Sequence, residues 1–235
     1  MSRGVKITAA IAVILLLGAG FYWWAALRDT SDPTASLDAM SVSAGSQLPA
    51  AGSAATPDGT WAIQQGADVW VGYRVNETIL PARTQRTVNG RSPAVTGTLT
   101  ISDGTVKEAS LTIDVTKLAS DLSVRDQVLQ NIGLETAKFP EATFKLREPV
   151  PLPSGLTEGT AVELTLKGTL TAHGVDHELD IAVQAKWDGS TIVVASTGEG
   201  AAFAMVDYGI ALPAVPIVEG YEKGTLEAQL RFAKQ

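Results

Sequence analysis

ELTLKGTLTAHGVDHELDIAVQAKW, residues 163–187, decides the fold class of this chain. Apolar and polar residues alternate on both sides of His173-Gly174, a dipeptide that signals a tight turn. A period of two places every second side chain on the same face of a strand, so each strand has an apolar and a polar face. Such strands are half buried and are typical of antiparallel sheets with one solvated face.

The same alternation recurs along most of the chain from Trp61 onward, with further turn signals at Asp103-Gly104 and Asp188-Gly189. Many alternating strands joined by short turns predict an all-β barrel or sandwich. The other alternating segments are VGYRV (71–75), GTLTI (97–101), ASLTIDV (109–115), STIVVAS (190–196) and TLEAQLRF (225–232).

One segment, residues 116–137, has a helical rather than a strand period. We expect one α-helix over about 117–133, with Asp121 or Ser123 as its N-terminal cap and Gly133 at its end. A helix inserted between strands covers either a barrel mouth or a sheet edge, and the sequence leaves both open. The apolar residues at spacings typical of an amphipathic helix are Leu118, Leu122, Leu129 and Ile132.

The N-terminal part contains an uninterrupted apolar run, residues 7–27, of 21 residues without a charge. At 1.5 Å per residue, a helix of this length measures about 31 Å and crosses the hydrocarbon core of a bilayer. Basic residues stay on the cytoplasmic side, and Arg3 and Lys6 precede the run. We therefore expect a single-pass protein of the cell membrane, with residues 1–6 in the cytoplasm and the folded domain on the extracytoplasmic side. The alternative is a cleaved signal peptide, for which Ala25 and Ala26 are suitably small.

Residues 28–58 are rich in Ser, Ala, Thr, Pro and Gly and contain few large apolar side chains. Such a segment buries too little apolar surface to offset its chain entropy, so we expect a disordered linker. Residues 59–235 are numerous enough to form one domain with a substantial core.

Composition excludes several functions. The formal net charge of −7 argues against nucleic acid or an anionic lipid surface as the main partner. The chain has no cysteine, and therefore no disulfide, thiol nucleophile or cysteine zinc site.

Histidine chemistry is also scarce, because the only two histidines, His173 and His177, fall in one predicted turn. With Asp176 and Glu178 they form the only candidate metal ligands, but residues four apart in a hairpin do not stack as they do on a helix. We expect these residues to be a solvated turn, and we predict no metal site.

We predict no catalytic residue and no cofactor, because no serine lies in a recognisable nucleophile motif. The alternative is an enzyme that acts on a lipid or a quinone-like molecule. Asp126 and Glu135, which flank the predicted helix, are then the carboxylates to test.

Three segments, SVRDQVLQNIGLETAKFPEATFKL (123–146), LKGTLTAHGVDHELDI (166–181) and VDYGIALP (206–213), are similar to the YceI-like family of small exported proteins. VGYRV (71–75) resembles the opening strand of that family. The resemblance implies a lipocalin-like antiparallel β-barrel associated with polyisoprenoid lipids. The matching positions include Arg125-Asp126, Leu129, Glu135, Phe139-Pro140, Thr143-Phe144, Gly168, Leu170, Thr171, Gly174 and Val175.

The resemblance also implies a lumen that binds a long apolar lipid, of polyisoprenoid or fatty-acyl type, without catalysis. Periodicity alone favours a filled interior, because every barrel has an apolar interior, and in that case the domain is a non-binding scaffold or interaction module of the cell envelope. An eight-stranded barrel is about the smallest that holds one small ligand. The predicted lumen residues are Val71, Tyr73, Val75, Leu99, Ile101, Leu111, Ile113, Phe144, Leu170, Ile181, Phe203 and Tyr208.

Three arginines, Arg83, Arg86 and Arg91, lie between two predicted strands in the segment 81–92. Guanidinium groups bind phosphate in a bidentate manner, so Arg83 and Arg86 are candidate contacts for a lipid head group. The alternative is that they are the charges of a solvated loop.

Overall fold

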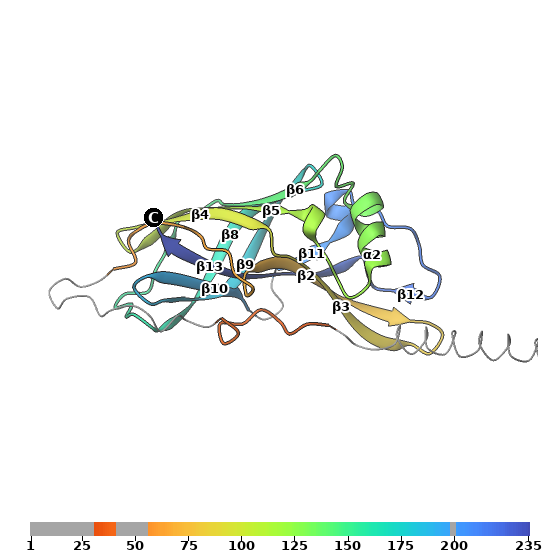
Figure 1. The fold of residues 1–235 in the computed structure, drawn as a ribbon, viewed down its shortest axis with the longest axis horizontal. Coiled ribbons are helices and arrows are strands. Elements are labelled where there is room, and N and C mark those ends of the chain that lie inside the picture. The colour runs from red at the N-terminus through yellow and green to blue at the C-terminus, as the bar shows by residue number, and fades with distance from the viewer. Residues whose placement is uncertain (1–30, 41–55, 198–200) are drawn as a thin grey trace, which may run out of the picture.

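The computed structural model describes residues 31–40, 56–197 and 201–235, which form a mainly β structure (Figure 1). An antiparallel sheet closes into an eight-stranded barrel with one α-helix at one end. The helical elements are α2 (Ser123–Val128), a π-helical turn η2 (Leu129–Gly133) and two 3₁₀ turns, η1 (Val115–Lys117) and η3 (Met205–Tyr208). The strands are β1 (Gly59–Ile63), β2 (Trp70–Ile79), β3 (Thr84–Ser92), β4 (Val95–Ser102), β5 (Thr105–Asp114), β6 (Glu141–Leu146), β7 (Val150–Pro151), β8 (Ala161–Ala172), β9 (Val175–Trp187), β10 (Thr191–Ser196), β11 (Ala201–Ala204), β12 (Val218–Glu219) and β13 (Lys223–Lys234).

The barrel closes because the long strand β13 pairs along both of its edges. Its C-terminal half pairs with β1 and β10, and its N-terminal half pairs with β2 and β11. β1 and β2 therefore behave as one interrupted strand, and they pair in turn with β4 and β3. The ring runs β1–β4–β5–β6–β8–β9–β10–β13 and returns to β1. The prediction of an antiparallel barrel is confirmed.

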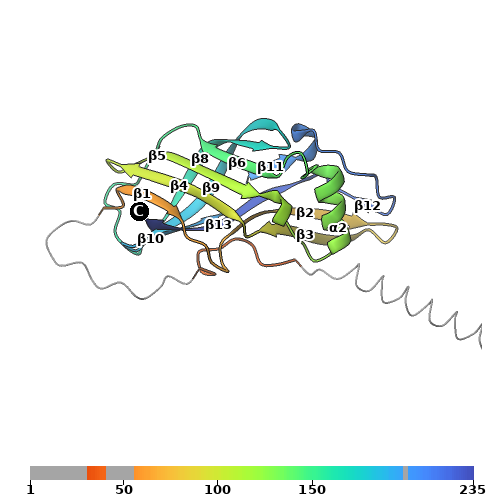
Figure 2. The same cartoon turned by 45° about the horizontal axis from the view of Figure 1, so that its top comes forward.

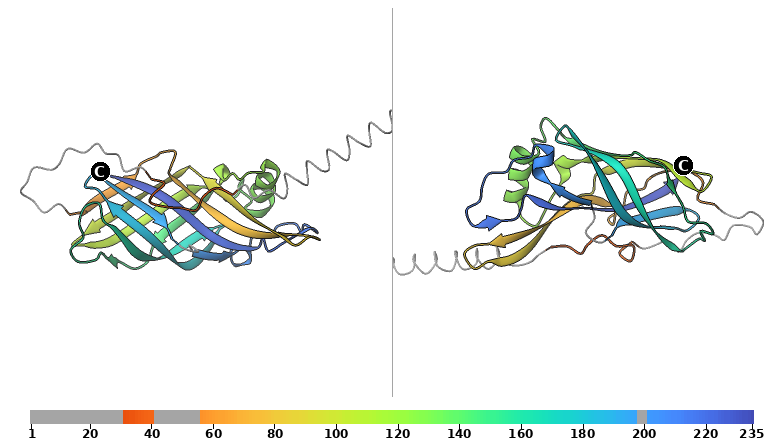
Figure 3. Two further views of the ribbon diagram at one scale, coloured as in Figure 1. Left: turned by 90° about the horizontal axis from the view of Figure 1, so that it is seen from below. Right: turned by 180° about the vertical axis from the view of Figure 1, so that it is seen from behind.

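The two ends of the barrel differ, as Figures 2 and 3 show. One end is formed by α2, η2, η3, the β8–β9 turn and the tip of the β2–β3 hairpin, and we call it the helical end. The opposite end is formed by loop 152–160 and the β9–β10 turn, and we call it the far end. The β2–β3 hairpin runs past the closed part of the barrel at the helical end.

Two of the three turn signals in the sequence have the backbone conformation of a two-residue hairpin turn, whereas at Asp188-Gly189 only the glycine has a positive φ. His173 and Gly174 have φ of 52° and 75°, and Asp103 and Gly104 have φ of 52° and 64°. Two successive positive φ values define the tight turn that suits the twist of a hairpin. Both dipeptides therefore join adjacent antiparallel strands, β8–β9 and β4–β5.

The alternation places apolar residues inside the barrel and polar residues outside. On β13, for example, Leu230 and Phe232 are buried in the interior, whereas Arg231 lies on the outer face and pairs with Asp68. The main core cluster fills much of the barrel towards the far end. Its buried members are Trp61, Val69, Val95, Leu99, Ile101, Val106, Ile113, Trp187, Ile192, Leu230 and Phe232.

The helix differs from its predicted bounds of 117–133, because it begins only at Ser123. Its N-terminal cap is Leu122, which makes no side-chain cap bond. Asp121 is not the cap because Arg86 and Arg125 bind its carboxylate. The prediction that Gly133 ends the helical segment is confirmed.

The apolar side chains of this segment divide between two environments. Leu118 and Leu129 are buried, but Leu122 is 46% exposed and Ile132 is 52% exposed. The segment therefore covers the barrel mouth with two of its four apolar residues and presents the other two to the outside.

Of the segment 28–58, predicted to be a disordered linker, residues 28–30 and 41–55 lie outside the described residues, but residues 31–40 have a defined place. Residues 31–40, which we call the strap, lie across the outer face of β2, β3, β13 and β10. Leu37 and Met40 are buried there against Val193 and Ala195. Two apolar residues at the right spacing are sufficient to dock a short segment, although the average composition of the region is polar.

The predicted membrane span at 7–27 lies outside the described residues. Within 31–40, 56–197 and 201–235, no helix combines the length and the apolar character needed to cross a bilayer.

Candidate functional site

The barrel interior contains an apolar cavity of about 190 Å³ that extends to the helical end. Strand residues that face inward form most of its wall, and residues of η2, η3 and the following loop, such as Leu129, Met205 and Ile210, close it at the helical end. Nine predicted lumen residues line it: Val71, Tyr73, Leu111, Ile113, Phe144, Leu170, Ile181, Phe203 and Tyr208.

A second apolar cavity, of about 90 Å³, lies towards the far end. Leu99 and Ile101, also predicted as lumen residues, line this second cavity together with Trp187 and Phe232. Val75, the remaining predicted residue, lines neither cavity. It packs beside Val88, Leu118 and Leu129 where the hairpin passes the barrel.

The two cavities meet at a partition that includes Phe144. The residues that line both are Leu111, Phe144, Leu166, Val183, Val194 and Leu230. The Phe144 ring lies over Gly168, where an added Cβ would be only 2.2 Å from its Cε2 and Cζ atoms. Any larger residue at 168 therefore collides with the ring. The absence of a side chain at Gly168 lets the Phe144 ring occupy its position in the partition.

The only titratable side chains in this wall, within the described residues, are Tyr73, Tyr208 and Glu227. Burial raises the pKa of both phenols, so both stay neutral at physiological pH. Glu227 is turned to the outer face, where its carboxylate accepts a 2.7 Å hydrogen bond from Arg74 Nε. The cavity therefore offers apolar contact and two neutral phenols.

The predicted head-group arginines have separate positions. Arg83 is exposed at the tip of the β2–β3 hairpin, in a left-handed conformation with φ of 54°. Arg86 is buried, and its Nη2 lies 2.8 Å from Asp121 Oδ2. Arg91 lies on the outer face, with its guanidinium carbon 3.8 Å from the centre of the Trp70 ring. The structure does not bring the three guanidinium groups to one point.

Arg86 belongs to an ionic cluster that ties the hairpin to the start of α2. Arg125 also binds Asp121, and Glu77 lies opposite Arg86 in the β2–β3 register. Glu77 is buried, and desolvation raises the pKa of its carboxyl more than Arg125 and Arg86 lower it. The sequence shows these charges but not their register, so this cluster is not predictable from the pattern.

The two histidines have structural contacts at the helical end. The imidazole of His173 lies between the Tyr208 carbonyl oxygen, 3.0 Å from Nδ1, and the Glu135 carboxylate, 2.8 Å from Nε2. His177 lies beside the Tyr208 ring at 5.5 Å between centroids. The described part of the chain contains no cluster of three or more histidine, aspartate or glutamate side chains arranged for a metal ion.

Asp126 and Glu135, the carboxylates of the enzymatic alternative, lie outside both cavity walls. Asp126 Oδ1 accepts hydrogen bonds from the backbone N–H and the hydroxyl of Ser120, at 2.9 and 2.6 Å. Glu135 pairs with His173. Both carboxylates therefore hold loops of the helical end in place.

The fold and cavities define a closed eight-stranded barrel with a hollow apolar interior and a helical cover. The chain belongs to the YceI-like family, since the model of the YceI-like domain matches residues 64–232.

One solved structure supports the same fold, and two others are similar at lower TM-scores. A polyisoprenoid binding domain from Saccharophagus degradans is 18% identical, with a TM-score of 0.55, over 74% of this chain and 98% of that chain. BcnA of Burkholderia cenocepacia is 14% identical, with a TM-score of 0.49, over 70% of this chain and 96% of its own. The YCEI protein of Campylobacter jejuni is 19% identical, with a TM-score of 0.47, over 62% of this chain and 84% of that chain. A comparison with curated proteins finds no match.

Proposed function

We propose that this protein binds the tail of a long apolar lipid, of polyisoprenoid or fatty-acyl type, in the barrel lumen without a catalytic step. The observation that carries this proposal is the apolar cavity of about 190 Å³ bounded by inward-facing strand residues. Apolar cavities of comparable size stay dry and take up apolar molecules. The Saccharophagus degradans domain, described as polyisoprenoid binding, supports a ligand of this class.

The cavity volume sets the length of tail that the closed barrel accommodates. A cavity of about 150 Å³ binds benzene, so about 190 Å³ holds roughly eight carbons. At about 0.8 kcal/mol per carbon, such a segment gains roughly 6 kcal/mol on leaving water. Immobilisation reduces this gain. Rotation of Phe144 would open the second cavity and lengthen the enclosed segment.

A non-catalytic role fits the polar groups of the lumen. Phenols with raised pKa values are poor general bases at neutral pH. Glu227 is engaged by Arg74 on the other side of the sheet. The lumen thus supplies shelter and apolar contact rather than proton transfer.

Residues 7–27 would anchor the chain in the cell membrane, with the barrel on the extracytoplasmic side. Support comes from the uncharged run of 21 residues and the basic residues before it. A tether to the bilayer keeps the barrel at high local concentration near its ligand.

The alternative of a filled scaffold predicts a solid interior, and the two cavities argue against it. The test is to purify the full chain from its membrane and to analyse its organic extract by mass spectrometry. We expect a stoichiometric apolar lipid. An extract without one, together with no uptake of added polyprenol, would favour the scaffold.

A further inference from the structure

Exposed large apolar side chains gather at the helical end of the barrel. In the described part of the chain, the far end has none of them, and their exposed fractions run from 43% for Ile217 to 77% for Val206. Soluble surfaces usually scatter such residues singly, whereas a contiguous group marks an interaction site. We call this group the docking face: Leu122, Val124, Ile132, Val206, Val215 and Ile217.

The docking face lies on the segments that close the larger cavity at the helical end. Its members belong to α2 and the residue before it, to η2, to η3 and to the loop before β12; α2 packs on η2, and η2 packs on the loop after η3. The space beside Gly133, for example, is bounded by Leu129, Ile210 and Leu212. Leu129 and Ile210 also line the cavity. The same segments therefore present apolar side chains outward and close the lumen inward.

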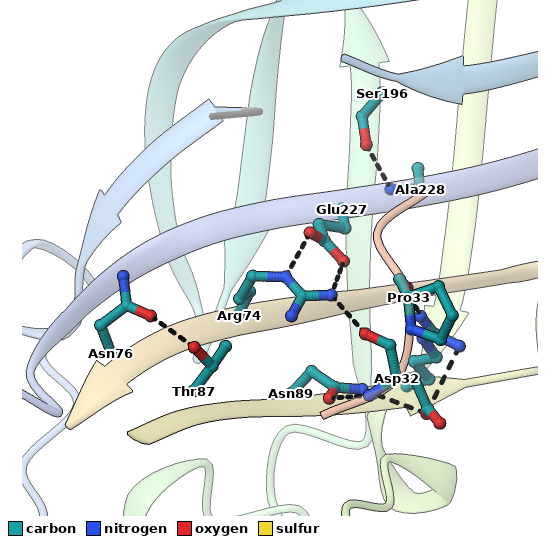
Figure 4. Close-up of polar contacts among 10 residues, drawn as sticks. Asp32, Pro33, Arg74, Asn76, Thr87, Asn89, Ser196, Glu227 and Ala228 are labelled. Atoms are coloured by element: carbon teal, nitrogen blue, oxygen red, sulfur yellow. Dashed lines mark hydrogen bonds and ion pairs between the residues drawn. The ribbon is translucent and has the colours of Figure 1, made fainter. Parts of the chain in front are cut away.

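Asp32 and Pro33, near the start of the strap, lie beside Arg74 and Asn89 (Figure 4). The Asp32 backbone N–H donates to Asn89 Oδ1 at 2.8 Å, and the Asp32 carbonyl oxygen accepts from Arg74 Nη2 at 2.8 Å. Further along, the Ser36 N–H donates to Gln229, and Met40 is buried on β10. The strap thus runs from the β2–β3 hairpin towards the far end, and its N-terminal residue is the one nearest the helical end.

The length of chain before the strap is short. The apolar run ends at residue 27, and four chain steps to residue 31 reach at most about 14 Å. Asp32 docks at Asn89, five strand residues or about 17 Å from the hairpin tip at Thr84. A bilayer that holds residues 7–27 therefore lies near the N-terminal end of the strap, which is the end of the strap closer to the helical end.

We propose that the docking face rests on the surface of that bilayer, so that a lipid tail passes from the membrane into the larger cavity without crossing water. This inference rests on the proposed function for its cargo, but the contact itself is tested separately. Because the chain has a formal net charge of −7, we expect apolar insertion rather than attraction to anionic lipids, and zwitterionic vesicles should suffice.

The experiment uses the full chain in phosphatidylcholine vesicles whose acyl chains are brominated, which quenches a nearby fluorophore. The chain lacks cysteine, so each single-cysteine variant carries one bimane label at one known place. Val124→Cys and Val206→Cys probe the docking face, and Ser154→Cys, exposed in the far-end loop, is the matched control.

We expect brominated lipid to quench the labels at 124 and 206 and to leave the label at 154 bright. Equal brightness at all three positions, equal quenching at all three, or failure of the full chain to float with the vesicles would overturn the proposal. A second variant, Val124→Glu with Val206→Glu, should keep its bound lipid and take up polyprenol from vesicles more slowly. Unchanged uptake by this variant would contradict docking. An absence of bound lipid in both the variant and the unaltered protein would contradict the proposed function, and the quenching result would then decide whether the docking face contacts the bilayer.

Discussion

Phe144 and Gly168 face each other inside the barrel at a separation that leaves no room for a side chain at 168. A Cβ there would be 2.2 Å from two atoms of the ring and 2.8 Å from the Lys145 carbonyl oxygen. The ring borders both cavities, so this contact fixes one part of the partition between the larger and the smaller space.

Gly168→Ala should destabilise the protein by about 1–3 kcal/mol, because the new methyl group displaces the Phe144 ring. Chemical denaturation measures the change. The double variant Gly168→Ala with Phe144→Leu removes the ring atoms that collide, and it should recover part of the loss. Strictly additive effects of the two substitutions would show that the ring and the methyl group do not interact.

Phe144→Ala should join the two cavities and lengthen the lipid segment that the barrel encloses. The cost is about 3–5 kcal/mol of stability, as expected for removing a buried aromatic ring. Mass spectrometry of the bound lipid, or binding of polyprenols of graded length, measures the change in preference. A preference identical to that of the unaltered protein would mean that Phe144 does not limit chain length.

Leu170→Trp should reduce the amount of bound lipid, because the larger side chain fills the cavity that Leu170 lines. Thr169→Trp is the matched control, since its side chain points to the opposite face of β8. Lipid content per protein, with melting temperature as a check on folding, separates the two variants. Equal lipid content in both would place the ligand outside this cavity.

Glu77→Gln should reveal a pH-dependent cost of the buried carboxylate. The folded-state pKa of Glu77 is raised, so its contribution to stability is fully present below the unfolded value of about 4.3. That contribution is lost as the pH rises through the folded-state pKa.

We therefore expect the unaltered protein to lose free energy of unfolding relative to Glu77→Gln as the pH rises from about 4 through the raised folded-state pKa of Glu77. Glu108→Gln, an exposed position on β5, gives the reference series. A difference that grows in favour of the unaltered protein at higher pH would show that Arg86 and Arg125 outweigh desolvation.

Eleven of the twelve predicted lumen residues border a cavity, most of them from strands whose alternation fixes the inward face, although Tyr208 does so from the turn η3. Val75 does not, because alternation fixes the face of a strand but not where that strand leaves the closed barrel. Residues such as Met205 and Ile210 have no comparable signal, as they reach the lumen from turns and loops.

Composition predicts the strap poorly for a different reason. Leu37 and Met40 are only two residues in a polar region, and the surface that receives them is assembled from distant strands. Likewise, the partners of Asp32 are 42 or more positions away in the sequence. Leu122 and Ile132 look like core residues in a helical pattern, but Leu122 precedes α2 and Ile132 lies in the π-helical turn η2, and both are exposed.

The most direct test of the central claim uses a polyprenyl probe with a photoreactive diazirine near the end of its tail. The probe is offered to the full chain in vesicles, and its adducts are mapped by mass spectrometry. We predict adducts on residues that line the larger cavity, such as Ile181 and Phe203. Adducts confined to the outer face of the strands or to the docking face would contradict a lumen that encloses the lipid.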